Sequence, residues 1–76
     1  MAGAVQTCLA RNKLFTDAWG CVQELNALDK LGGDAARRVQ FIRLGDDLAT
    51  QVEAKTVSDA DARTRLLTGL SAEGAS

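Results

Sequence analysis

Two cysteines, Cys8 and Cys21, are the most reactive side chains in a sequence of 76 residues that contains no His and no Tyr. A structural zinc site needs four Cys or His ligands, usually with a close C-x-x-C pair, and these two cysteines are far apart and alone. We therefore expect no metal and no cofactor. Cys-His and Ser-His catalysis are also excluded for these residues, because both depend on histidine as the base.

Two pairs of aspartates are the remaining candidates for acid and base chemistry: Asp46 with Asp47, and Asp59 with Asp61. Adjacent residues on a helix point about 100° apart, so the first pair does not face a single substrate. The second pair follows Ser58 in a pattern that resembles a capping box, which gives both aspartates a structural role at a helix start. The sequence therefore predicts a protein that is not an enzyme.

Helices must position these residues, because proline is absent and the two most frequent residues are Ala and Leu, both strong helix formers. The paired glycines Gly32 and Gly33 are expected to end one helix, and Asp34 to cap the next, as in an αα-hairpin. Asn12 and Gly20 are weak points in the first helix. Gly45 could end a helix within the second, although we favour continuity there.

The expected fold is all-α: a small antiparallel helical hairpin or bundle of three helices, or four, completed by oligomerisation. One domain covers residues 1–70, and a small polar tail over 71–76 is expected to be disordered. So short a chain buries only part of its surface and needs further stabilisation. The expected helices span about 5–30, 34–56 and 59–69.

The cysteines are expected to be reduced. A continuous helix over 5–30 would separate Cys8 from Cys21 by roughly 20 Å, which is too far for a disulfide. Residues 1–6 do not resemble a secretory leader, and no apolar run approaches the roughly 18 residues of a membrane-spanning helix. These observations favour a cytoplasmic protein that does not act at a membrane.

A broad apolar arc follows the first expected helix. Its seam repeats at intervals of four and three through Leu14, Ala18, Cys21, Leu25 and Leu28. Phe15, Trp19 and Val22 lie beside that seam, so the arc is wider than two short helices can cover. Trp19 by itself is as readily explained by the core of a monomer. For the whole arc we predict a partner-binding surface at Phe15, Trp19 and Val22, covered by a second copy or another protein.

Basic residues surround the predicted turn and form a candidate contact for nucleic acid or an anion: Lys30, Arg37, Arg38 and Arg43. The formal net charge of -1 argues against long-range attraction to nucleic acid or membranes. Acidic residues four positions before Arg38, Arg63 and Arg65 favour local ion pairs on solvated helices instead. A helix-turn-helix over 49–67 also fits poorly, because Thr56 stands where the turn needs glycine.

The function expected from these patterns is that of a small helical interaction protein, such as an adaptor, an inhibitor or an assembly factor. It would act by protein-protein binding, with a homodimer or another protein as partner. The alternative is a nucleic-acid-binding regulator that uses the basic residues near the turn. The abundance of Ala and Gly, with more Arg than Lys, is typical of GC-rich bacterial or phage genomes.

Overall fold

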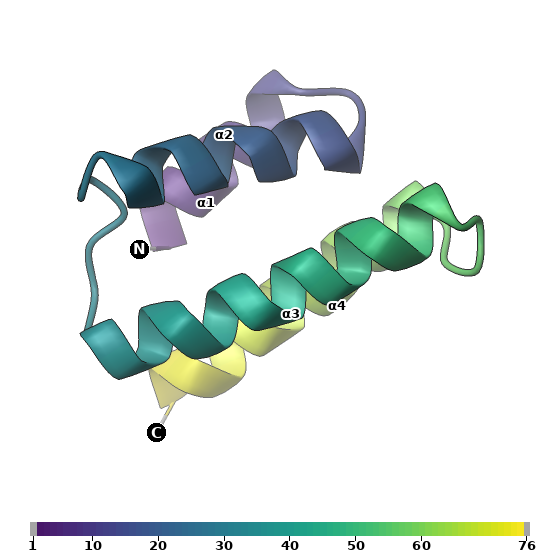
Figure 1. The fold of residues 1–76 in the computed structure, drawn as a ribbon. Helices are drawn as coiled ribbons and strands as arrows, with labels where there is room; N and C mark the ends of the chain where they lie inside the picture. Colours follow the sequence, from purple (N-terminus) through teal and green to yellow (C-terminus); the bar gives the residue numbers. More distant parts are fainter. Residues whose placement is uncertain (1, 76) are drawn as a thin grey trace.

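The computed structural model describes the backbone of residues 2–75 and the side chains up to residue 70. This part of the chain contains four helices: α1 (Ala2–Arg11), α2 (Phe15–Ala27), α3 (Ala35–Glu53) and α4 (Asp59–Ala75). Figure 1 shows two hairpins, α1–α2 and α3–α4, with α2 lying alongside α3. The all-α prediction is confirmed, and the helices pack as a small four-helix bundle.

The expected helix over 5–30 is two helices. The α1 helix ends at Arg11, and the chain reverses through residues 12–14 before α2 begins. Asn12 marks the stop, because its side-chain amide donates to the carbonyl oxygen of Cys8 at 2.8 Å. Such a local side-chain bond favours ending the helix over continuing it. Gly20, the other weak point, lies within α2 and does not break it.

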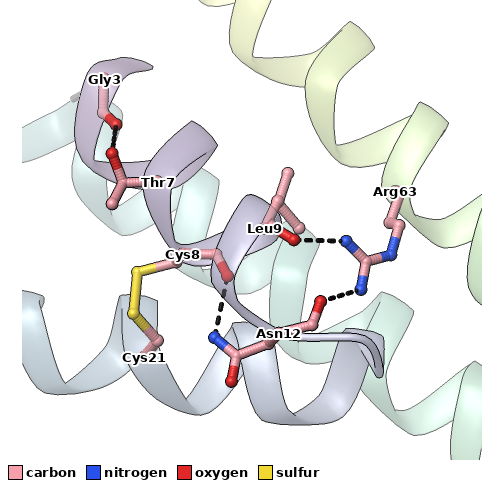
Figure 2. The surroundings of a disulfide bond; sticks show 7 residues. All are labelled: Gly3, Thr7, Cys8, Leu9, Asn12, Cys21 and Arg63. Atoms are coloured by element: carbon pink, nitrogen blue, oxygen red, sulfur yellow. Dashed lines mark hydrogen bonds between the residues drawn. A yellow bond between two sulfur atoms is a disulfide. The ribbon is translucent and has the colours of Figure 1, made fainter.

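This reversal brings Cys8 and Cys21 together in a disulfide bond, with their Cα atoms 5.6 Å apart (Figure 2). The prediction of reduced cysteines was wrong because it assumed one straight helix between them. In a hairpin the second helix returns past the first, so the same stretch of chain closes the distance. The disulfide therefore joins α1 to α2 and supplies stabilisation that a chain of this size needs.

The α2 helix ends at Ala27, before the paired glycines that were expected to end it, and Asp29 has a positive φ angle of 58° just beyond that end. Asp34 stands at the N-cap position of α3 as predicted, but its side chain makes no cap hydrogen bond. Gly32 and Gly33 have φ angles of 81° and 80°, a conformation that side chains other than glycine rarely adopt. The α3 helix continues through Gly45, as favoured. The start of α4 agrees with the sequence prediction. Ser58 Oγ accepts a hydrogen bond from the backbone N–H of Asp61 at 3.1 Å, as expected of a helix cap.

The α4 helix extends to Ala75, so the backbone is helical over most of the stretch that was expected to be a disordered tail. Ser76 lies outside the described residues, and no side chain beyond residue 70 is described.

The core lies between the two hairpins and is centred on Trp19. The indole is 3% exposed, lies against the backbone of Gly45, and is tilted against the ring of Phe41 with centroids 5.9 Å apart. Its Nε1–H donates to Asp46 Oδ1 at 2.8 Å, which satisfies its polar atom. The other buried apolar side chains come from every helix and the α2–α3 turn: Val5, Cys8, Leu9, Phe15, Ala18, Val22, Leu31, Phe41, Leu48, Ala62, Leu66 and Leu70.

Replacing both cysteines, Cys8→Ala with Cys21→Ala, should lower the free energy of unfolding by about 2–4 kcal/mol. The closed loop restricts the unfolded chain, and the double substitution restores that freedom. Urea unfolding followed by the fluorescence of Trp19, the single Trp of the sequence, measures the change. The wild-type chain unfolded in a reducing agent is the control and should behave like the double variant. An unchanged midpoint after reduction would contradict a stabilising role for the bond.

Two glycines within helices give a matched pair of tests. Helix propensity alone predicts that alanine stabilises both sites by up to about 1 kcal/mol. At Gly45 a new methyl group would overlap the Trp19 indole, so Gly45→Ala should instead destabilise the chain by about 1–3 kcal/mol. Nothing lies near the corresponding position at Gly20, so Gly20→Ala should stabilise the chain. Thermal unfolding of both variants distinguishes these effects, and stabilisation by Gly45→Ala would disprove the close approach.

Candidate functional site

The residues predicted to bind a partner are buried in the core of the single chain. Phe15, Trp19 and Val22 are 0%, 3% and 0% exposed. Two helices of the same chain, α1 and α3, pack on α2 and cover its wide apolar arc. The two ends of the expected seam, Leu14 and Leu28, are each 57% exposed instead. The folded chain therefore offers none of the three predicted residues as a contact surface.

A different apolar surface remains open in a groove between the end of α2 and the first half of α3. The groove has a volume of about 370 Å³. It is lined by Asn26 of α2 and by five residues of α3: Ala35, Arg38, Val39, Ile42 and Arg43. Val39 is 54% exposed, and Ile42 is half-buried against the core. We call this feature the α2–α3 groove.

The structure places two of the four predicted basic residues at this groove and two outside it. Arg38 and Arg43 line the groove, whereas Lys30 and Arg37 are exposed and do not line it. Arg38 Nη1 donates to the carbonyl oxygens of Gly33 at 2.6 Å and of Gly32 at 3.4 Å. The ion pair expected between Asp34 and Arg38 is not formed, because the guanidinium bonds to these turn carbonyls.

A second polar site lies at the corner between α1 and α2, and it is structural. Arg63 of α4 donates from Nη1 to the carbonyl oxygen of Leu9 at 2.7 Å (Figure 2). Its Nη2 donates to the carbonyl oxygens of Asn12 at 2.7 Å and Lys13 at 2.8 Å. Its Nε donates to Asp59 Oδ2 at 2.8 Å, in the ion pair that the spacing predicted. One guanidinium thus satisfies carbonyls at the C-terminal end of α1, where a helix leaves its acceptors unpaired.

Asp59 completes this corner by capping α2 rather than only its own helix. Its Oδ1 accepts a hydrogen bond from the backbone N–H of Phe15, the first residue of α2. A carboxylate at a helix N-terminus also interacts favourably with the helix dipole. The pKa of Asp59 is lowered chiefly by the hydrogen bond from Arg63, with a further contribution from the Phe15 N–H. We call Asp59 and Arg63 the corner clamp.

One aspartate of each candidate pair accepts hydrogen bonds that join parts of the fold. Asp46, from one candidate pair, accepts hydrogen bonds from Trp19 Nε1 and Gln23 Nε2, both at 2.8 Å. Asp59, from the other pair, belongs to the corner clamp. In the part of the chain that the structure describes, no cluster of His, Cys, Asp or Glu could hold a metal ion. Both aspartates therefore have identified structural partners.

Comparisons with protein-family models, with curated proteins and with solved structures give no match for this chain. Among residues 2–75, no helix combines the length and the apolarity that crossing a membrane requires.

Sequence reasoning missed the apolar part of the α2–α3 groove. Val39 lies two positions before the buried Phe41, about 200° around the helix, and therefore outside the buried face of α3. The available signal was an apolar residue, Val39, that lies outside the buried face of α3 and has basic residues near it in the sequence. The corner clamp had a weaker signal, because the spacing of Asp59 and Arg63 predicted their ion pair but not their contacts with a distant part of the chain.

The corner clamp predicts a loss of stability in acid. Because the pKa of Asp59 is lower in the folded chain than in the unfolded chain, its contribution is complete above the ordinary aspartate pKa of about 3.9. That contribution is lost as the pH falls below about 4 toward the lowered value. Asp59→Asn should therefore unfold more easily at neutral pH and lose less further stability in acid.

Urea unfolding at a series of pH values measures this difference in slope. Asp47→Asn is the matched control, because Asp47 is exposed and makes no side-chain hydrogen bond or ion pair with the described side chains. It should keep the slope of the wild-type chain. An Asp59→Asn variant that retained the wild-type slope would contradict the role of the clamp.

Proposed function

We propose that this chain is a small non-enzymatic binding protein that holds a partner protein in the α2–α3 groove. The observation that carries the proposal is the open apolar lining of the groove, where Val39 is 54% exposed between two arginines. Exposed apolar residues with polar neighbours are typical of protein contact sites. The proposed contact surface is therefore the α2–α3 groove, in place of the buried face of Phe15, Trp19 and Val22.

Three observations support a binding role over catalysis. The sequence has no His and no Tyr, and both cysteines are joined in the disulfide. Asp46 and Asp59, one from each candidate acid-base pair, already accept hydrogen bonds that join parts of the fold. The groove contains arginines and apolar side chains but no residue that could act as a general base or a nucleophile at neutral pH. An adaptor, an inhibitor or an assembly factor would each act by occupying such a surface.

The nucleic-acid alternative retains one observation in its favour. Lys30 and Arg37 are exposed near Arg38 and Arg43 in the sequence, so positive charge is concentrated around the turn. The apolar lining of the groove favours a protein partner, because phosphate backbones are bound by basic and polar groups rather than by Val39 and Ile42. A second copy of the chain remains an alternative occupant.

The disulfide also changes the proposed location. The cytoplasmic location expected from the sequence depended on reduced cysteines. A bond between Cys8 and Cys21 is maintained in oxidising compartments and is rare in the reducing cytosol. We therefore propose that the chain acts outside the reducing cytosol.

A photoactivatable amino acid placed at Val39 should crosslink a specific protein in the cells that make this chain. Crosslinking requires the photoactivatable group to lie within bond-forming distance of the occupant. The same amino acid at Thr64, an exposed residue of α4 that does not line the groove, should therefore give no adduct. Mass spectrometry of the adduct identifies the partner and the contacting segment.

Each other outcome of the crosslinking experiment contradicts the proposal. An adduct with twice the mass of the chain would show a homodimer in place of a separate partner. An adduct with nucleic acid would support the regulator. Equal adducts at Val39 and Thr64, or no adduct at either, would show that the groove is not a contact site.

A further inference from the structure

The charge of the chain is unevenly distributed, and the positively charged stretch 30–43 contains five of the six residues that line the α2–α3 groove. Residues 30–43 contain four basic side chains and one acidic side chain, a net charge of +3, whereas the whole chain has a formal net charge of -1. The remainder of the chain is therefore acidic. A partner attracted specifically to the groove should carry negative charge at the contact, because local charge complementarity steers association and selects partners.

Two arginines bound the apolar strip of the groove, one on each side. With about 100° per residue, Ala35, Val39 and Ile42 fall within about 60° of one another around α3. Arg38 and Arg43 lie at the two edges of this strip, about 140° apart. The groove surface therefore consists of a central apolar strip with a guanidinium along each margin.

Both guanidinium groups have donors to offer to a ligand. Arg43 makes no hydrogen bond or ion pair with any of the described side chains or the backbone. Arg38 uses Nη1 for the turn carbonyls, which holds its head group in place while Nε and Nη2 are not used in these bonds. Planar guanidinium forks of this kind match the two oxygens of a carboxylate.

We propose that the α2–α3 groove binds an acidic amphipathic helix of the partner protein. Such a helix presents a ridge of apolar side chains to Val39 and Ile42, and carboxylates on both sides of that ridge pair with Arg38 and Arg43. Docking of an apolar helix face into a groove between two helices is a common mode of peptide recognition. This inference rests on the proposed function and adds the chemistry of the partner.

The geometry favours this occupant over two others. A nucleic acid would leave the apolar strip without a counterpart, since its phosphates match only the arginines. A second copy bound through the same surface about a two-fold axis, the commonest arrangement of homodimers, would place two positively charged segments against each other. An acidic amphipathic helix matches the apolar strip and both margins together.

The test uses a designed helical peptide with leucines along one face and glutamates on both sides of that face. Its matched control replaces every glutamate by glutamine and keeps the leucines. Fluorescence anisotropy with the full, disulfide-bonded chain should show binding of the acidic peptide at least about tenfold tighter than that of the control, a difference of about 1.4 kcal/mol. Chemical-shift changes should be concentrated at Val39, Ile42 and their neighbours.

Two variants of the same charge change separate the groove from general electrostatic attraction. Arg43→Ala should lower the affinity for the acidic peptide by about threefold to fivefold, as expected of a partly exposed ion pair. Arg65→Ala removes one positive charge from the exposed surface of α4 and should leave the affinity within about twofold. Circular dichroism confirms that both variants keep their helices.

The inference is overturned if the acidic and neutral peptides bind equally, if Arg65→Ala weakens binding as much as Arg43→Ala does, or if the shifts lie outside the groove. Tighter binding of an oligonucleotide than of the acidic peptide would also overturn it. These failures differ from failure of the proposed function. A specific crosslink at Val39 together with peptides that do not discriminate would retain a protein partner and reject its acidic helix.

Discussion

The packing of the Trp19 indole against the backbone of Gly45 is the contact on which the arrangement of the two hairpins depends. The largest side chain of the sequence lies where α2 meets α3, and only a residue without a side chain leaves room for it. The bond from its Nε1–H to Asp46 then satisfies its polar atom at the edge of the core. This packing buries the wide apolar face of α2 within the chain. The apolar surface that stays open therefore lies elsewhere, at the α2–α3 groove.

The α1 helix is attached to the rest of the chain by three kinds of interaction. Val5 and Leu9 pack in the apolar core, the disulfide joins this helix of only 10 residues to α2, and the guanidinium of Arg63 bonds to its end. So short a helix is not stable alone in water, because few hydrogen bonds follow its nucleation. The disulfide and the corner clamp lie near the α1–α2 corner. The groove lies toward the other end of α2, where its lining is available for a partner.

The parts of the fold that local signals determine could be predicted from the sequence, and the parts that distant contacts determine could not. The helical composition and the cap at Ser58 depend on neighbouring residues, and both were predicted, whereas α2 ends at Ala27, before the glycines that were expected to end it. The end of α1 had a local signal in Asn12, but the direction of the reversal that follows is fixed by Asp59 and Arg63, about 50 positions away along the sequence. Missing that reversal also hid the disulfide and placed the contact surface on a face that the chain buries. Periodicity showed that α2 is amphipathic, but not which helices would cover it.

The corner clamp has a consequence for the order in which the chain is completed. Its hydrogen bond from Arg63 to the carbonyl oxygen of Leu9 spans 54 positions, so Leu9 is synthesised well before Arg63. The N-terminal hairpin leaves the ribosome well before α4, and its corner carbonyls remain bound to water until Arg63 arrives. Oxidation of Cys8 and Cys21 can therefore precede the clamp, fixing the hairpin while its corner is still hydrated. The carbonyl groups at the end of α1 thus reach their final environment only after α4 is made.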